Sequence, residues 1–192
     1  MHKTKKRIFE IAMELFAKKG YESASIEEIT AVVGIAKGTF YYHFNSKEEI
    51  FNFLVEEGIS LLINSILIKA DKAKTMEEKL KAVMVVQIKV ISKYENFIRM
   101  VATEMWGNEP RNVHCRKQLY KYIDNIEEIV KEGVKKGEIR EGNTKIIATE
   151  IFGLLSGSLI HKIRNDESVD FNELKKEYEK LALKYIISGE TV

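Results

Sequence analysis

Side chains suited to holding an anion gather between residues 37 and 47. Lys37 and Lys47 each stand where a helix is expected to begin. Both ammonium groups donate hydrogen bonds, as do the free amide groups of a helix start. A lysine at the positive end of a helix is unfavourable by roughly a few tenths of a kcal/mol unless an anion sits there too. The pattern therefore favours phosphate binding, and a nucleic-acid backbone is the obvious source of phosphate.

Two capping boxes predict where the helices around these residues begin. Ser25 and Glu28 have the spacing at which a serine oxygen accepts from the third helical amide while the glutamate returns to the cap. The helix that starts after Ser25 should end at Gly34, because a left-handed residue is least costly for glycine. Ser46 opens a second box, which places the next helix start at Lys47.

The short helix between these two boxes has an aromatic face. Phe40 and Phe44 are four residues apart and share one side of a helix. Tyr41 and Tyr42 turn roughly 100° and 200° away from Phe40 at helical pitch. We therefore expect both phenylalanines to be buried. The two tyrosines cannot both be buried with them.

The N-terminal region resembles the DNA-binding domain of the tetracycline repressor (TetR) family of bacterial regulators. The resemblance rests on the run GIAKGTFYYHFNSKEEI, with IEEIT before it and KRIFEIAMELFAKKGYESAS upstream. Helix, gap and turn spacings all agree with the family. Thr30 and Val33 depart from it, since the family usually has alanine there, so slightly wider packing between the first two helices is expected.

Carried over position by position, the resemblance implies that Lys37, Gly38 and Tyr41 approach base edges in the major groove. Lysine donates to guanine acceptors, glycine permits close backbone approach, and a tyrosine ring packs on a thymine methyl. Phosphate contacts set position without reading sequence. The residues that the resemblance places on phosphates are Ser25, Thr39, Tyr42, His43 and Lys47.

Each of these roles has a structural alternative. The two lysines could be ordinary solvated side chains, and the two tyrosine rings could cover the small core. His43 is alternatively a surface histidine, and Thr39 a buttress of the turn.

Composition indicates a soluble protein and predicts a cytoplasmic location. With 192 residues and 45% hydrophobic content, the chain can bury one sizeable core or two modest ones. Its one cysteine, Cys115, excludes an internal disulfide. The start MHKTKKRIFEI lacks the apolar run of a signal peptide. The apolar stretch from Ile146 to Ile160 is too short to span a bilayer and contains Glu150, so no membrane partner is expected.

The distribution of charge argues against binding by charge alone. The net charge is +2, and residues 1–47 hold eight Lys and Arg against five Asp and Glu. This modest surplus favours localised contacts over histone-like binding. Lys3, Lys5, Lys6 and Arg7 could form a basic arm on DNA or a frayed, solvated terminus.

The rest of the chain is predicted to be helical, which gives an all-α protein of about nine helices. Pro110 is the only proline, and no strand pattern with turn signals is present. We predict a three-helix, helix-turn-helix DNA-binding domain at residues 1–47 and a larger bundle that senses ligand and dimerises at residues 48–192. Helix starts are expected at Lys47, Met76, Asn96, Pro110, Thr144 and just after Asp170.

The helix expected from Thr144 to Arg164 is apolar on all sides and must therefore be buried on all sides. Small residues along it allow another backbone to come close, which favours a second subunit there. The alternative is a central core helix in a monomer. Together with the last helix, the predicted dimer interface comprises Gly153, Ser156, Gly157, Leu181 and Tyr185.

The resemblance also implies a pocket among the central helices for an apolar or aromatic small-molecule effector. Large pliable or aromatic side chains suit such a cavity, although each could equally belong to the core. The candidates are Met84, Ile88, Met100, Trp106, Tyr120 and Phe152, with Trp106 the strongest.

These features predict a sequence-specific transcriptional regulator, a repressor that binds a palindromic operator as a homodimer and is released by its effector. The alternative is an architectural DNA-binding protein with weak sequence preference and a purely structural bundle. An enzyme is not expected, because the four histidines are scattered and no metal motif, cysteine pair or phosphate loop is present. For the same reason we expect no metal and no cofactor.

Overall fold

Every regular element that the structure describes is a helix, which confirms the all-α prediction. The computed structural model describes residues 3–165, 170, 172–173, 176–177, 180 and 186–187; it leaves out the side chains of residues 91, 92, 155 and 158–165. Eight helices lie within these residues, close to the nine expected. They are α1 (Lys3–Lys19), α2 (Ile26–Val33), α3 (Lys37–His43), α4 (Lys47–Asp71), α5 (Met76–Lys93), α6 (Glu95–Glu104), α7 (Pro110–Lys135) and α8 (Thr144–Asn165). Most of the expected last helix falls outside the described residues, although Asp170 Oδ1 accepts from the Asn172 amide at 2.8 Å, as its cap should.

The caps predicted for α2 are confirmed at both ends. Ser25 Oγ accepts from the Glu28 amide at 3.1 Å, and the Glu28 carboxylate accepts from the Ser25 amide at 3.3 Å. Gly34 ends the helix with a φ of 75°, in the left-handed region. The amide of Gly34 donates to the Thr30 carbonyl at 2.9 Å, so the turn into α3 is closed by backbone hydrogen bonds.

The second capping box differs from its prediction in one half. Ser46 Oγ accepts from the Glu49 amide at 3.0 Å, as expected, and α4 begins at Lys47. The Glu49 carboxylate, however, accepts from the Asn45 amide at 2.7 Å, one residue before the cap. Phe44, with an extended φ of −146°, ends α3, so the connection to α4 is short.

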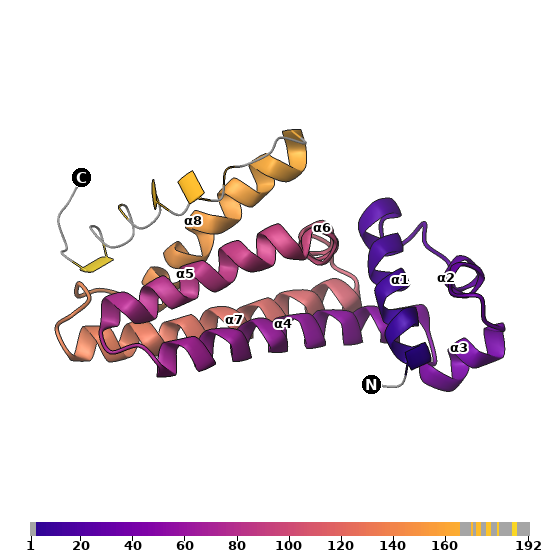
Figure 1. The fold of residues 1–192 in the computed structure, drawn as a ribbon, viewed down its shortest axis with the longest axis horizontal. Coiled ribbons are helices and arrows are strands. Elements are labelled where there is room, and N and C mark those ends of the chain that lie inside the picture. The colour runs from indigo at the N-terminus through magenta and orange to yellow at the C-terminus, as the bar shows by residue number, and fades with distance from the viewer. Residues whose placement is uncertain are drawn as a thin grey trace. The chain divides into compact units, whose positions relative to one another are not determined.

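The residues divide into two compact units, the first of which comprises residues 1–60 and 94–119. In this unit α1 contacts α6 on one side and α2 on the other (Figure 1). Ile8, Ala12 and Phe16 of α1 are fully or almost fully buried. Gly58 of α4 lies directly against the Phe97 ring of α6, because a Cβ built at Gly58 would be 2.3 Å from that ring.

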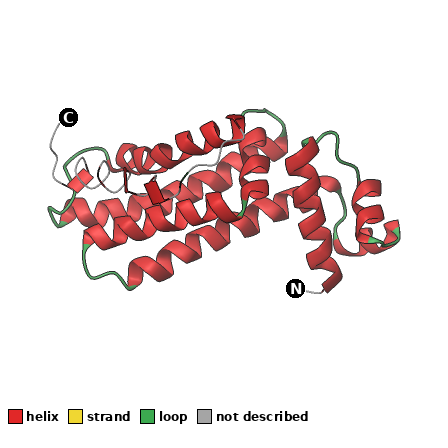
Figure 2. Ribbon diagram, turned by 45° about the horizontal axis from the view of Figure 1, so that its top comes forward, coloured by secondary structure: helices red, strands yellow, loops and turns green. Residues whose placement is uncertain are grey.

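The second unit comprises residues 61–93 and 120–192. Here the later part of α4 runs beside α5 and α7 (Figure 1), and α8 contacts α5. Figure 2 shows the same all-helical arrangement from a second direction. Its buried core includes Leu80 and Val83 of α5, Ile126 of α7 and Ile151 of α8. The predicted boundary between residues 47 and 48 stays a prediction, since the two units follow contacts and each contains separated stretches of sequence.

Within the part described, α4 is the one helix long and apolar enough to cross a membrane by length and composition. Its best window has a mean hydropathy of 1.5 and is 39% buried. A core helix of a soluble protein passes the same test, so this observation is weak evidence for a membrane segment.

Candidate nucleic-acid interface

The polar face of α3 is open to solvent, and its aromatic face is buried. Phe40 and Phe44 are 0% and 2% exposed, whereas Tyr41 and Tyr42 are 44% and 84% exposed. This confirms the burial predicted from the spacing of the four rings. A Cβ built at Gly38 would meet nothing within 4 Å, so the backbone there can be approached closely.

Lys37, the predicted base reader, makes an ion pair with Glu27 of α2. Its Nζ donates to the Glu27 carboxylate, and both side chains are more than half exposed. This hydrogen bond lowers the pKa of Glu27 and raises the pKa of Lys37. An exposed pair of this kind contributes little to stability. A DNA base could therefore exchange for Glu27 as the acceptor of Lys37.

Lys47, one of the predicted phosphate ligands, is partly exposed and donates to backbone carbonyls of its own chain. Its Nζ donates to the carbonyls of Tyr21 and Ala24 at 2.9 and 3.1 Å, and to that of Glu22 at 3.3 Å. It also lies 4.3 Å from the centre of the Tyr21 ring. These bonds hold the turn between α1 and α2 against the start of α4. Binding of phosphate by Lys47 stays a prediction, with three carbonyls as competitors.

Arg111 of α7 also contacts the turn between α1 and α2. Its guanidinium carbon is 4.3 Å from the centre of the Tyr21 ring, and Nη2 is 2.6 Å from the Glu22 carboxylate. Its Nε donates to Glu104 at 3.0 Å, and Asn112 Nδ2 donates to the same carboxylate at 2.7 Å. Sequence reasoning missed this cluster, because Arg111 and Glu22 are 89 positions apart and no local pattern joins them.

The remaining predicted phosphate ligands are Ser25, Thr39 and His43, which lie on or beside α2 and α3. Ser25 accepts from Glu28 with its oxygen, so its hydroxyl proton stays available to a phosphate. Thr39 and His43 are both partly exposed. The His43 ring stands edge-on to Tyr42 at 5.0 Å.

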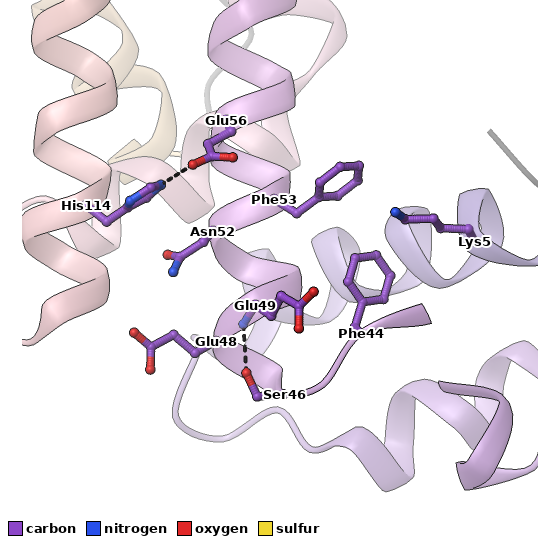
Figure 3. A pocket seen from close by; sticks show the side chains of 9 residues that line it. All are labelled: Lys5, Phe44, Ser46, Glu48, Glu49, Asn52, Phe53, Glu56 and His114. Atoms are coloured by element: carbon purple, nitrogen blue, oxygen red, sulfur yellow. Dashed lines mark hydrogen bonds and ion pairs between the residues drawn. The ribbon is translucent and has the colours of Figure 1, made fainter. Parts of the chain in front are cut away.

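The residues of the expected basic arm lie in the first turns of α1, which begins at Lys3, and their contact with DNA stays a prediction. Lys5 Nζ lies over the rings of Phe53 and Phe44 at 4.5 and 5.1 Å. It borders a cavity of about 490 Å³ that is lined mainly by α4 (Figure 3).

Carboxylates dominate the other walls of this cavity. Figure 3 shows the His114 ring directed at Glu56, and the two are 3.2 Å apart. Glu48 and Glu49 lie nearer the start of α4. Carboxylates repel phosphate, so this cavity is a poorer candidate for the nucleic-acid interface than α3.

The six predicted effector contacts do not share one environment. Met84, Ile88 and Met100 are buried, and Phe152 is partly exposed. Trp106 and Tyr120 are 82% and 57% exposed, so in this conformation neither lines an enclosed cavity. Trp106 was the strongest candidate, but it follows the end of α6 and its ring faces solvent.

Two predicted interface glycines on α8 have open space beside them. A Cβ built at Gly153 or Gly157 would meet nothing within 4 Å, and both residues are exposed. Ser156 Oγ donates to the Phe152 carbonyl at 2.9 Å, which uses its hydroxyl within the helix. Leu181 and Tyr185 lie outside the described residues. The dimer contact itself stays a prediction.

Family models match both parts of the chain. The model "Bacterial regulatory proteins, tetR family" covers residues 8–54, which include α2, α3 and the start of α4. The model "Tetracyclin repressor-like, C-terminal domain" covers residues 73–186, more than half of the chain. The chain belongs to the TetR family.

Individual TetR-family proteins match over most of their length. A proposed fatty acid metabolism regulator from Clostridium perfringens is 32% identical with a TM-score of 0.86, over 97% of this chain and 99% of that one. FadR from Bacillus subtilis, solved with stearoyl-CoA, is 25% identical with a TM-score of 0.82, over 97% and 99%. The regulator QacR from Staphylococcus aureus is 31% identical over 79% of this chain and 84% of its own.

Membership of the TetR family settles the class of function. The chain is a DNA-binding transcriptional regulator and not an enzyme. TetR-family regulators bind operator DNA as dimers and respond to small molecules, which supports the repressor prediction over the architectural alternative. The relatives are bacterial transcription regulators.

Proposed function

We propose that this TetR-family protein is a cytoplasmic repressor that reads an inverted-repeat operator with α3 and is released by a fatty acyl-CoA. The exposed polar face of α3, with Tyr41 and Tyr42 outward and Phe40 inward, carries the DNA-reading part. Similarity to FadR, which was solved with stearoyl-CoA, supports the effector class.

On the operator, Lys37, Gly38 and Tyr41 approach base edges. Lys37 leaves Glu27 for a guanine, and the open backbone at Gly38 lets α3 enter the major groove. The phosphate ligands are the hydroxyls and cations around α3, namely Ser25, Thr39, Tyr42, His43 and Lys47.

Dimerisation gives two copies of α3 a fixed separation. Two recognition helices related by a two-fold axis occupy successive major grooves about 34 to 36 Å apart. The open flank of α8 at Gly153 and Gly157 supports a helix-to-helix contact with a second copy.

The effector acts by preferring one spacing of the two DNA-reading helices. A ligand that binds both conformations equally shifts nothing, so the acyl-CoA must favour the conformation that does not fit DNA. A coupling of roughly 1–3 kcal/mol is usual for such systems. The buried side chains of Met84 and Ile88 offer the apolar surroundings that an acyl chain needs.

Selection of bound sequences from a random DNA pool tests the DNA-reading part. The parent should select a palindrome, and Lys37→Ala should relax the preference at one symmetric pair of positions. Lys117→Ala, which removes an exposed lysine of α7, is the matched control and should select the parental palindrome. Selection of no palindrome by the parent would contradict the proposal, and uniform weakening by Lys37→Ala would make Lys37 a phosphate contact.

Release is tested on the selected operator. Stearoyl-CoA should lower operator affinity about tenfold, the middle of the usual coupling range, while coenzyme A alone should have little effect. Unchanged operator affinity across a series of acyl-CoA chain lengths would contradict the effector class and leave the DNA-reading part standing.

A further inference from the structure

Two buried polar atoms in the second unit lack hydrogen-bond partners among the described residues. They are Oε1 of Gln87 on α5 and the hydroxyl of Tyr122 on α7. Gln87 is 5% exposed and Tyr122 is 1% exposed, so solvent does not compensate either group. Buried polar groups are paired in the large majority of cases, and each exception requires a specific explanation.

The two groups are neighbours. Burial raises the pKa of the Tyr122 hydroxyl, and a contact with the Gln87 side chain opposes that rise. Among the described residues, neither the Tyr122 hydroxyl nor the Gln87 carbonyl oxygen has a partner at full hydrogen-bond geometry. The site therefore presents one acceptor beside one group that both donates and accepts.

An aromatic ring packs on this polar pair, and buried apolar residues lie beside Gln87 in the sequence of α5. The Phe152 ring of α8 stands edge-on to Tyr122, with ring centres 5.9 Å apart. Met84 and Ile88 lie three residues before and one residue after Gln87 on α5, and both are buried. A small number of placed polar groups in apolar surroundings is the usual composition of a small-molecule site.

The chemistry of the pair limits what it can hold. A methylene chain satisfies neither atom, and a ketone or ester carbonyl accepts from Tyr122 but gives nothing to Gln87. A hydroxyl or a secondary amide does both, because it donates to Gln87 Oε1 and accepts from the Tyr122 hydroxyl. An acyl-CoA can supply such a group in two ways, as a hydroxyl on the chain or as an amide of the pantetheine arm.

We propose that Gln87 and Tyr122 form the polar recognition point of the effector site, which takes a ligand whose apolar body carries a hydroxyl or secondary amide. The inference rests on the proposed function and deepens it. It adds a chemical requirement that apolar packing around Met84 and Ile88 does not impose. Discrimination of this kind is strong, because a ligand without the matching group leaves buried polar atoms unpaired.

Calorimetric titration of the full-length protein with four probes tests this proposal. The probes are stearate, stearoyl-CoA, 3-hydroxystearoyl-CoA and 12-hydroxystearoyl-CoA. Tyr122→Phe removes the hydroxyl alone, and Gln87→Met removes the amide while keeping an unbranched side chain. Tyr94→Phe, which removes a hydroxyl from an exposed tyrosine, is the matched control. Thermal unfolding of each variant without ligand separates a binding role from a structural one.

Both variants should bind the recognised probe about tenfold more weakly than the parent and the control do, as expected for one lost hydrogen bond with its partner left buried. A loss confined to the hydroxylated probes identifies the chain hydroxyl. An equal loss for all three thioesters, with stearate unchanged, identifies the pantetheine amide. In either case the melting temperature of Tyr122→Phe should not fall below that of the parent.

The proposal is overturned if neither variant changes the affinity of any probe that the parent binds. A melting temperature several degrees lower for Tyr122→Phe, with unchanged affinities, would make the pair a structural contact. Failure of the parent to bind any of the four probes would contradict the proposed effector class, and this inference with it.

Discussion

At the scale of single residues, Tyr21 is held between two cations. Lys47 and Arg111 each lie 4.3 Å from the centre of its ring, and the ring is 8% exposed. Cation–π contacts strengthen when they are desolvated, to about 2 kcal/mol. Burial raises the pKa of Tyr21, and the nearby Glu48 carboxylate adds to the rise. The turn between α1 and α2 is therefore fixed by side chains from two other helices.

Arg111→Ala should destabilise the protein by about 2 kcal/mol, because it leaves the buried Glu104 carboxylate without its guanidinium partner. The loss of stability should be smaller than for a buried carboxylate with no partner, because Asn112 still donates a hydrogen bond to Glu104. Urea unfolding measures it. Arg99→Ala, which breaks a half-exposed pair with Glu95 on α6, is the control and should lose less than about 0.5 kcal/mol. Equal losses would contradict the buried role of Arg111.

Cys115 should resist thiol reagents at pH 8.5 until the protein unfolds. The side chain is fully buried, and burial raises the pKa of its thiol to about 12, so the reactive thiolate is scarce in the folded state. Reaction with a chromogenic disulfide, with and without urea, measures this. Rapid reaction of the native protein would contradict it.

The same shift predicts how stability depends on pH. The pKa is raised in the folded state, so the thiol's contribution is fully present below its unfolded value of 9.0 and is lost as pH rises towards 12. Between these values the free energy of unfolding should fall more steeply in the parent than in Cys115→Ala, by at most about 1.4 kcal/mol per pH unit. Identical slopes would contradict the shift.

Residues with local partners could be predicted from the sequence, and residues with distant partners could not. The Ser25 and Glu28 box and the burial of Phe40 depend on neighbours within four positions, so spacing alone fixed them. The long side chain of Lys47 reaches carbonyls that lie 23 to 26 positions earlier in the chain. No pattern in the sequence indicates that Lys47 contacts the turn between α1 and α2.

At the scale of elements, helix starts follow their caps closely. The Glu78 amide donates to Thr75 Oγ1 at 3.1 Å, and the Ile146 amide donates to Asn143 Oδ1 at 3.2 Å, as the sequence predicted for α5 and α8. The exposure of Trp106 was not predictable in the same way. It depends on how the chain turns from α6 into α7, which the contacts of Asn112 with Glu104 fix.

Gly58→Ala should destabilise the contact between α4 and α6 by about 1 kcal/mol. The added Cβ would stand 2.3 Å from the buried Phe97 ring, and overpacking typically exceeds the gain in helix propensity. Urea unfolding measures the change. In a Phe97→Leu background the substitution should become neutral or stabilising, because the ring is gone. A loss that persists in that background would contradict the steric explanation.

At the scale of the whole molecule, the association of two copies decides whether DNA can be read as a palindrome. The net charge of +2 is too small for binding by charge alone, so affinity must come from paired half-sites. On α8, Gly153 and Gly157 have open space beside them, where a second copy can approach.

Gly157→Leu should shift the protein from dimer to monomer at micromolar concentration and weaken operator binding more than tenfold. A Cβ at this position meets nothing within 4 Å, and the rest of the leucine side chain would keep a second backbone away. Light scattering after size exclusion measures the mass. Lys117→Leu, at an exposed position on α7, is the control. A Gly157→Leu protein that stays dimeric would place the interface elsewhere.

The first unit is built from two separated stretches of sequence, which limits how its DNA-reading part can be replaced by that of another protein. Residues 1–47 share their core with residues 94–119, through the packing of α1 on α6 and through contacts such as Tyr21 with Arg111. A chimaera that grafted another reader at residue 47 would lose the matching α6 and the start of α7. Modular recombination should therefore succeed only when the graft carries both separated stretches, or when α6 has adapted to its new neighbour.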